Sequence, residues 1–212
     1  MKYLFLIIIS ISLFCSCKNE KKSPPNIKTP EVKIDSTLIT DSSWGIINSS
    51  SNFEKLQQLF GESNIKDERI CGPECADSVD VTKVYPGKSG EIVVYWKDSA
   101  YHKKIDFLQT YQDKSPYHTA AGLKMGSTLN EVLKLNGQKI NFSGFGWDYG
   151  GGIQSFNNGK LDKSAISFIL DLTDYSDESL VGEIGLDTDM PQVKKALDKI
   201  VIYFLSLTFN KE

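Results

Sequence analysis

Apolar and polar positions along the chain first follow a helical period and then a strand period. Over residues 53–60 apolar side chains recur every three or four positions, which predicts a short amphipathic helix. Ser51 or Asn52 can cap its start, because the side-chain oxygen of either residue accepts a hydrogen bond from a free backbone amide. Gly61 supplies the left-handed conformation in which many helices end.

β-Branched and aromatic residues then predominate in short runs. Residues 79–85, 92–96 and 105–109 show the alternation or the enrichment that predicts strands. Turn-forming residues at 86–90 and 97–99 separate these runs. The pattern therefore predicts a helix that is followed by an antiparallel meander.

The same order of elements begins again in the second half of the chain. Thr128 and Glu131 have the spacing of a capping box, and Gly137 can end the helix that they begin. Residues 53–61 align with residues 129–137 without a gap, so the two predicted helices lie 76 positions apart. An internal duplication of this length predicts two similar units packed side by side.

Strand patterns again follow the second predicted helix. Asn157, Asn158 and Gly159 form a tight-turn signal, since these residues tolerate positive φ. Pro191 can open a short helix that reaches Lys199. The predicted strands of this half span residues 140–149, 153–156, 165–172 and 201–209.

The clearest copy of the repeat runs from Gly122 to Gly137, with a Thr-x-x-Glu cap and aliphatic residues at helical spacing. This motif resembles the repeat of the SmpA/BamE outer-membrane lipoproteins and the tandem repeat of the β-lactamase inhibitor proteins. The resemblance implies an α+β fold of two tandem helix-plus-antiparallel-sheet units, over 37–115 and 116–212. It also implies a non-enzymatic adaptor or inhibitor role with an envelope protein as partner. The whole chain resembles a group of uncharacterised bacterial lipoproteins of Bacteroidetes type.

The N-terminus has the pattern of a secretory signal peptide over residues 1–16. Lys2 precedes a mostly apolar run from Tyr3 to Phe14. A run of about a dozen residues is too short to cross a bilayer core, which takes roughly 20 residues. The segment therefore directs export and does not anchor the protein by itself.

Residues 14–17, Phe-Cys-Ser-Cys, resemble the bacterial lipobox, in which a small residue precedes the lipidated cysteine. By that resemblance Cys17 carries the lipid, and Cys15 fits less well because bulky Phe14 precedes it. A plain signal peptide cleaved near Cys17 is the alternative. Several acyl chains anchor a protein stably, so we expect a cell-envelope protein, with the outer membrane favoured over the inner one. Residues 17–36 are rich in Lys, Pro and Asn, which predicts a disordered tether.

Charge and composition argue against several classes of function, among them nucleic-acid binding and catalysis. The net charge is −3 and Arg69 is the single arginine, so a basic nucleic-acid groove is not expected. His102 and His118 have neither the spacing nor the adjacent carboxylate that a metal or catalytic site needs. The sequence contains no nucleophile elbow, phosphate loop or dinucleotide fingerprint. We therefore expect no enzyme activity, no cofactor and no metal.

Cys71 and Cys75 are the cysteines left in the mature chain, in the sequence Cys-Gly-Pro-Glu-Cys. In an oxidising envelope such a pair is expected to form a disulfide. The three intervening residues and the loop context differ from a thioredoxin-type redox loop, and two cysteines are an incomplete metal site. Redox or copper handling and free thiols are the alternatives.

Residues 144–152 concentrate three aromatic residues and five glycines. As a strand, this stretch would project Phe145, Trp147 and Tyr149 to one face. Such a row is either a binding comb for a sugar, a peptide or a partner strand, or a core face, and the large area of aromatic rings favours the core. Asp148 has no acidic partner nearby in the sequence and completes the candidate binding residues.

These observations rank three hypotheses. The first is a membrane-anchored envelope lipoprotein that acts as a non-enzymatic protein-binding module. The second is a small-molecule or glycan binder that uses residues 144–152. The third is thiol-redox or metal handling by Cys71 and Cys75.

We predict that Cys17→Ser releases the protein from the membrane fraction, because a protein without acyl chains loses its anchor. Cys15→Ser is the matched control and should leave the protein in the membrane fraction. Fractionation of envelopes followed by intact-mass analysis checks both variants. An unmodified Cys17 peptide recovered from membranes would contradict lipidation.

Overall fold

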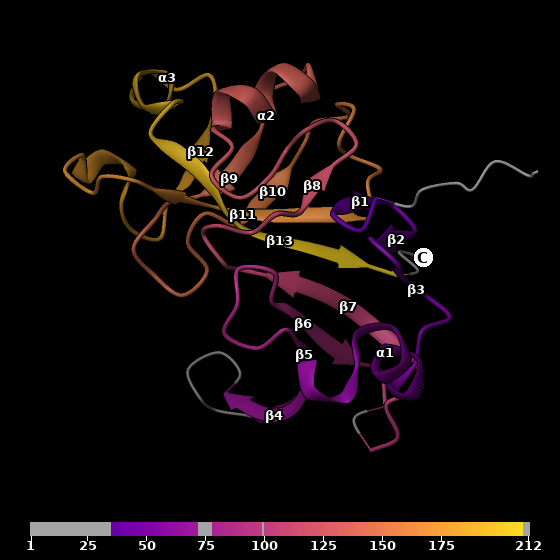
Figure 1. Cartoon of the computed structure of the whole chain (residues 1–212). Helices are drawn as coiled ribbons and strands as arrows, with labels where there is room; N and C mark the ends of the chain where they lie inside the picture. The colour runs from indigo at the N-terminus through magenta and orange to yellow at the C-terminus, as the bar shows by residue number, and fades with distance from the viewer. Residues whose placement is uncertain (1–34, 72–77, 99, 210–212) are drawn as a thin grey trace, which may run out of the picture. The chain divides into compact units, whose positions relative to one another are not determined.

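The computed structural model describes residues 35–71, 78–98 and 100–209. The predicted signal peptide, Cys17 and the tether up to residue 34 lie outside the described residues, so they stay predictions. Among the residues described, no helix is both long and apolar enough to cross a membrane. The described part has a mixed α+β fold in which strands predominate (Figure 1).

The largest sheet has six strands, and every neighbouring pair in it is antiparallel (Figure 1). Its first and last members in spatial order come from opposite halves of the chain. The strands in that order are β11 (Ile166–Leu172), β13 (Ile200–Thr208), β7 (Ile105–Thr110), β6 (Ile92–Trp96), β5 (Ser78–Val84) and β4 (Ile65–Cys71).

Two smaller sheets and short helices complete the described fold. One sheet has the order β10 (Ile153–Ser155), β9 (Asn141–Ser143) and β12 (Gly185–Asp187). The other has the order β3 (Ile47–Asn48), β2 (Ser43–Trp44), β1 (Leu38–Thr40) and β8 (His118–Thr119). The helices are α1 (Phe53–Phe60), α2 (Leu129–Asn136) and α3 (Pro191–Ala196), with 3-10 helices η1 (Glu62–Asn64) and η3 (Glu178–Leu180).

The two halves of the chain share one sheet, which corrects an expectation from sequence. Strand β13 lies between β7 and β11, and its Leu205 pairs with Thr110 on one side and with Phe168 on the other. The expected arrangement of two tandem helix-plus-sheet units is therefore wrong, because the described residues form three sheets. The bounds 37–115 and 116–212 stay predictions. Pairing of β7 with β13 satisfies backbone groups that two separate sheets would leave unpaired at their edges.

Local capping places both predicted helices. Asn52 caps α1 by accepting a hydrogen bond from the Lys55 amide at 2.8 Å, and Gly61 follows the helix with a positive φ. Thr128 and Glu131 form the predicted capping box of α2, with donor–acceptor distances of 2.8 and 3.3 Å. Both helices have eight residues and start at positions that the alignment matches, so the two predicted helices are confirmed.

The turns before the two helices also have matching hydrogen bonds, which apolar spacing does not reveal. The Asn48 amide donates to Ser51 Oγ at 3.2 Å, and the Ser51 amide donates to the Asn48 carbonyl at 2.9 Å. Lys124 and Ser127 make the same two bonds, at 3.2 and 3.0 Å. Both serines are buried, so each helix is entered through a turn that side chain and backbone hold together.

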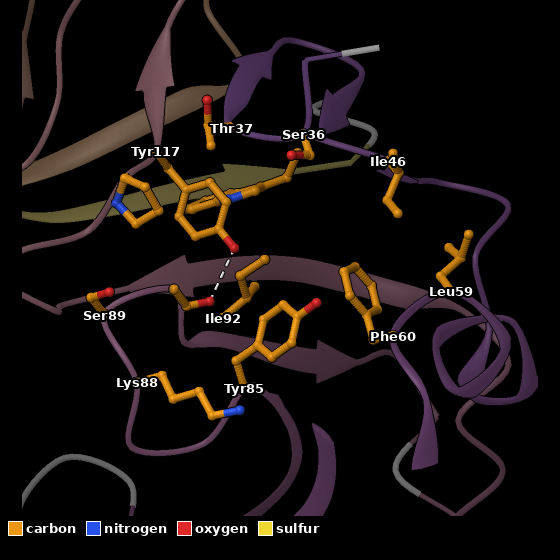
Figure 2. A pocket seen from close by; sticks show the side chains of 13 residues that line it. Ser36, Thr37, Ile46, Leu59, Phe60, Tyr85, Lys88, Ser89, Ile92 and Tyr117 are labelled. Carbon is orange, nitrogen blue, oxygen red and sulfur yellow. Dashed lines mark hydrogen bonds between the residues drawn. The ribbon is translucent and has the colours of Figure 1, made fainter. Parts of the chain in front are cut away.

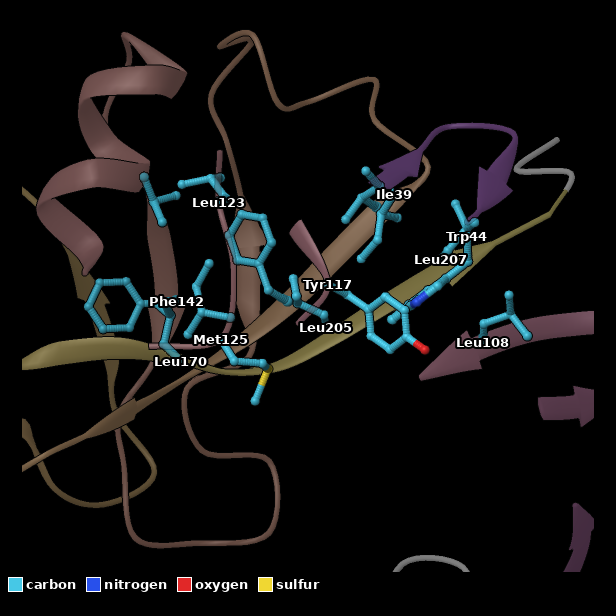
Figure 3. Packing of buried hydrophobic residues seen from close by; sticks show 14 of the residues in the cluster. Ile39, Trp44, Leu108, Tyr117, Leu123, Met125, Phe142, Leu170, Leu205 and Leu207 are labelled. Carbon is cyan, nitrogen blue, oxygen red and sulfur yellow. The ribbon is translucent and has the colours of Figure 1, made fainter. Parts of the chain in front are cut away.

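The core lies on one face of the six-stranded sheet. Strand alternation sends Leu108, Leu205 and Leu207 to this face, where they join Ile39 and Trp44 from the small sheet at the start of the fold (Figure 3). All five side chains are essentially without solvent contact. One continuous hydrophobic cluster therefore holds the sheets and helices together.

Most of the predicted strands are confirmed to within one or two residues, whereas β4 and several short strands, β1, β8 and β12 among them, were not predicted. Strand β4 escapes the apolar pattern because residues 66–69 are all charged. Charged residues are typical of edge strands, and β4 is an edge of the six-stranded sheet. The confirmed predictions are 79–85, 92–96, 105–109, 153–156, 165–172 and 201–209, which correspond to β5, β6, β7, β10, β11 and β13.

We predict that Thr128→Ala lowers the free energy of unfolding by about 1 kcal/mol, because the first turn of α2 loses its N-cap acceptor. Lys134→Ala, at an exposed position of the same helix, is the control and should change stability by no more than about 0.5 kcal/mol. Chemical denaturation followed by circular dichroism measures both. Equal stability of the two variants would argue against the capping box.

Candidate functional site

The strand predicted at 140–149 ends early. Strand β9 stops at Ser143, and residues 148–151 form a turn. Phe145 is 1% exposed and packs against Phe142 with a ring-centroid distance of 5.8 Å. Phe145 is therefore a core residue.

The other two rings of this stretch do not share a face with Phe145. Trp147 is half-buried, and its indole N–H donates to the Gly144 carbonyl at 2.9 Å. Tyr149 is 61% exposed and meets Trp147 edge-on at 5.5 Å, and Asp148 is exposed beside it. The expected row of three aromatic rings is therefore wrong. A binding role for these residues stays a prediction.

Glycines in the stretch allow backbone segments to cross closely. A Cβ atom on Gly151 would overlap the carbonyl of Leu170, and one on Gly144 would lie 2.5 Å from the carbonyl oxygen of Gly182. Gly151 also has a φ of 69°, which L-residues rarely adopt. The glycine-rich composition is therefore explained by the packing of this turn against β11 and against the segment after η3.

Cys71 is the last residue of β4 and lies opposite Ser78, the first residue of β5. Its predicted partner Cys75 falls in the 72–77 segment, which lies outside the described residues. The disulfide between Cys71 and Cys75 therefore stays a prediction. Strands β4 and β5, on either side of that segment, pair antiparallel.

The two histidines lie apart and face different carboxylates. His102 Nδ1 is 3.8 Å from Asp67 Oδ2, and His118 Nε2 is 3.9 Å from Asp35 Oδ2. In the described ranges, no three His, Cys, Asp or Glu side chains gather in a way that could hold a metal ion.

His102 has a structural setting that sequence spacing does not indicate. Its ring stacks on Trp96 at 5.0 Å, and its backbone has a φ of 51°. The Trp96 indole donates to Thr82 Oγ1 at 2.9 Å, and Thr82 donates in turn to Asp67 at 2.6 Å. The carbonyl of His102 accepts from the Phe53 amide at 3.1 Å, so this histidine ties the loop before β7 to the start of α1.

The face of the six-stranded sheet opposite the core is a broad candidate binding surface, which we call the open face. On it Tyr95 of β6 and Phe107 of β7 are cross-strand neighbours, and their rings stack at 4.2 Å with an interplanar angle of 18°. Strand alternation and register assign to the open face Glu68, Val81, Lys83, Val93, Tyr95, Phe107, Gln109, Tyr111, Ser167, Ile169, Tyr203, Phe204, Ser206 and Thr208.

Some apolar side chains of the open face reach solvent, whereas Val81 and Val93 on the same face are fully buried. Tyr111 is 37% exposed, Ile169 is 36% exposed and Tyr203 is 50% exposed. The described helices pack on the core side instead, since buried Leu56 of α1 and Val132 of α2 belong to the core cluster. The fold therefore leaves this aromatic surface without a helical cover in the described part of the chain.

One ion-pair network lies on the open face near β4. Lys83 Nζ is 2.9 Å from Glu68 Oε2, and Lys66 Nζ is 3.8 Å from the same oxygen. The hydrogen bond from Lys83 lowers the pKa of the Glu68 carboxyl, and the same bond raises the pKa of Lys83. Burial raises the pKa of Tyr95 and of Tyr111. Both phenols therefore stay neutral at physiological pH and can donate hydrogen bonds.

A groove of about 550 Å³ runs over the open face where residues 152–156 meet the sheet. Phe107 and Phe204 supply apolar wall, and Gln109 and Ser206 supply neutral hydrogen-bonding groups. Apolar and polar contacts are therefore available side by side on this surface. The sequence did not single out these residues, because alternation alone does not say which face of a strand the helices will cover.

Comparisons with known proteins assign no family. No protein-family model matches the chain, and no curated protein matches it. Among solved structures, the chain is similar to the crystal structure of the uncharacterized protein yfeY from Escherichia coli, with 9% sequence identity and a TM-score of 0.46. That match covers 82% of this chain and 100% of the other. A likeness at this level identifies neither a family nor a function.

We predict that Gly151→Ala lowers the free energy of unfolding by about 2 kcal/mol or more, because the new methyl group overlaps the Leu170 carbonyl at a positive φ. Gly152→Ala is the matched control. Its Cβ would meet the nearest atom, the Tyr149 carbonyl oxygen, at 3.4 Å, which is an ordinary contact. Thermal melts followed by circular dichroism compare them, and equal melting temperatures would contradict the packing account of this turn.

Proposed function

We propose that this chain is a lipid-anchored lipoprotein of the bacterial cell envelope that binds a protein partner through its open face, as an adaptor or inhibitor and not as an enzyme. One observation carries the proposal. The six-stranded sheet presents exposed aromatic and aliphatic side chains on the face that its described helices leave uncovered. Exposed apolar patches of this kind mark interaction surfaces.

The open face has the dimensions and the chemistry of a protein interface. Six strands spaced by about 4.8 Å, each roughly six residues long, make a surface of roughly 24 by 20 Å. One partner in a standard interface contributes about 800 Å² of accessible surface, so the flat area of this face, roughly 480 Å², accounts for more than half of such a contribution. Aromatic residues are enriched in interface cores. The Tyr95–Phe107 stack lies on β6 and β7, the two central strands of the sheet, and the Lys83–Glu68 ion pair lies nearer the β4 edge.

The predicted lipid at Cys17 and the predicted tether over 17–36 complete the proposal. An extended tether at about 3.1 Å per residue reaches roughly 60 Å. The folded part could therefore meet a partner at some distance from the membrane, with the outer membrane as the favoured location.

We also infer that the two halves derive from one tandem unit of the kind that the SmpA/BamE lipoproteins and the β-lactamase inhibitor proteins contain. After α1, the strands β4, β5, β6 and β7 follow as antiparallel neighbours. After α2, β9 pairs with β10 and β11 pairs with β13, and a bridge between Gly152 and Ile169 connects the two pairs. Strand β12 and helix α3 are then an insertion before β13. The adaptor or inhibitor role itself rests on the resemblance and on the open face.

The alternative roles have less support. Residues 144–152 do not present a row of rings, because Phe145 belongs to the core. The described residues provide no support for thiol-redox or metal handling by Cys71 and Cys75, since Cys75 lies outside them.

We predict that a photo-crosslinking amino acid at Tyr203 captures the partner in intact envelopes, whereas the same amino acid at Tyr101 does not. Tyr101 is 71% exposed, but it lies in the loop before β7, next to the segment that contacts α1. Mass spectrometry of the crosslinked band identifies the partner, and equal capture at both positions would count against the open face.

With the partner purified, Tyr111→Ala and Tyr203→Ala should each weaken binding by about tenfold, the effect of removing one aromatic anchor. Tyr101→Ala, which also removes an exposed tyrosine, should leave the affinity unchanged. All three should keep the parental melting temperature, because these side chains are at least one-third exposed. Calorimetry measures the affinities, and unchanged binding in both open-face variants would sink the proposal.

A further inference from the structure

A pocket of about 400 Å³ lies at the end of α1, on the core side of the sheet and apart from the open face (Figure 2). Sites for small molecules have volumes of roughly 300–1,000 Å³, so this pocket falls in their range. Phe60 from α1, Tyr85 and Ile92 from the sheet region, and Trp44 and Tyr117 from the start and middle of the chain supply its apolar walls.

Contacts among the aromatic side chains hold these walls in place. Tyr117 and Trp44 meet edge-on at 5.3 Å, and Phe60 and Tyr85 meet edge-on at 5.5 Å. The Tyr117 hydroxyl donates to the Gly90 carbonyl at 3.0 Å (Figure 2). Burial raises the pKa of Tyr117 to about 12, so this hydroxyl stays protonated and keeps donating. The pocket is therefore formed without a ligand.

Tyr85 adopts a backbone conformation that non-glycine residues rarely take, with a φ of 55°. The Tyr85 amide donates to the Asn64 carbonyl at 2.8 Å, and the Lys88 amide donates to the Tyr85 carbonyl at 3.1 Å. Strained residues of this kind persist where surrounding contacts impose them, and they cluster at ligand sites. Here the conformation points the Tyr85 ring at the pocket (Figure 2).

The described lining of the pocket carries positive charge and no negative charge. Among the described residues that line it, Lys88 is the single charged one, and none is acidic. Lys88 is exposed at the rim, where its Nζ donates to Asn64 Oδ1 at 3.0 Å and lies 5.4 Å from the centre of the Tyr85 ring. An apolar cavity with one cation at its rim suits a ligand that has an apolar body and one negative end.

A second pocket, of about 380 Å³, takes the equivalent place in the other half of the chain. The offset of 76 positions that relates the two helices also relates six lining residues of the two pockets. The matched pairs are Trp44 and Ala120, Leu59 and Leu135, Tyr85 and Leu161, Lys88 and Ser164, Gly90 and Ile166, and Ile92 and Phe168.

The two pockets differ in chemistry although their positions repeat. In the second, aliphatic side chains replace Trp44 and Tyr85, and Ile166 takes the place of Gly90. The second also contains two lysines, Lys160 and Lys163, and a carboxylate, Asp41, which accepts hydrogen bonds from Ser164 Oγ at 2.7 Å and from the Ala165 amide at 2.8 Å. The first pocket has four aromatic wall residues and a cation with no carboxylate in the lining, whereas the second has one aromatic residue, Phe168, and a carboxylate beside its cations.

We propose that the first pocket binds an alkyl carboxylate of fatty-acid type, with the alkyl chain against the aromatic walls and the carboxylate at Lys88. The alkyl chain matches the apolar lining, and the carboxylate matches the lone ammonium group. The second pocket, with Asp41 in its lining, is not a site for this ligand.

The experiment titrates the purified full chain with dodecanoate and follows tryptophan fluorescence, because Trp44 lies in the pocket wall. Isothermal titration calorimetry provides a second reading. Gly90→Val should weaken binding by about tenfold or more, since the added side chain fills the volume that the ligand needs. A Cβ at this position would meet the nearest atom, the Tyr117 hydroxyl oxygen, at 3.6 Å, which is an ordinary contact, and a thermal melt checks that the two γ-carbons of valine leave the fold intact.

Ala120→Val is the matched control, because it alters the equivalent position of the second pocket and should leave dodecanoate binding unchanged. Lys88→Gln tests the charge: it should weaken dodecanoate binding roughly fivefold, the value of an exposed ion pair of about 1 kcal/mol, and should leave dodecanol binding unchanged. Tyr203→Ala, on the open face, should bind dodecanoate normally, which separates this proposal from the protein-binding role.

Three results would overturn the proposal. One is the failure of the unaltered chain to bind dodecanoate. Another is an Ala120→Val effect as large as that of Gly90→Val. The third is an equal loss of dodecanol and dodecanoate binding in Lys88→Gln, which would mean that the lysine acts on the shape of the pocket and not on the charge of the ligand.

Discussion

Antiparallel pairing between β7 and β13 is the interaction on which the rest of the described structure depends. It joins strands from the two halves of the folded chain through backbone hydrogen bonds, from Thr110 opposite Leu205 to Phe107 opposite Thr208. Because of this pairing, the core cluster is continuous through both halves. The same pairing makes the opposite face continuous, so that the rings of Tyr95 and Phe107 and the side chain of Phe204 lie on one surface. The open face therefore forms only when the two halves pair, and neither half contains it alone.

Local features of the fold could be predicted from the sequence because their causes are local. The cap made by Thr128 and Glu131 needs only residues three positions apart, and β6 is a run of β-branched and aromatic residues that needs little context. Partner choice between distant strands has no local cause, so the position of β13 could not be predicted. The prediction of a strand over residues 144–149 was wrong for a different reason. The aromatic residues suggested a strand, but Gly151 has a left-handed φ and approaches Leu170 closely, and this backbone conformation requires a turn.

The candidate sites were harder to predict than the elements that carry them. Alternation along β6 and β7 shows that Tyr95 and Phe107 point away from Val94 and Leu108, but it does not show which side the helices will cover. The aromatic pocket collects side chains from the start, the helical part and the middle of the chain, and spacing in the sequence does not bring them together. The alignment of the two helices did contain one usable signal, since the same offset also relates the two pockets.

The charged segment of β4 has a consequence for how copies of this protein coexist. Strand β4 is an edge of the six-stranded sheet, and residues 66–69 carry four consecutive charges. Under the proposed lipid anchor, copies of this protein would share a thin layer at the membrane, where their local concentration is high and an apolar edge would invite strands of neighbouring copies to add to the sheet. Charges on an edge oppose such addition because they would lose their hydration. The edge therefore favours separate copies and directs any partner to the face of the sheet.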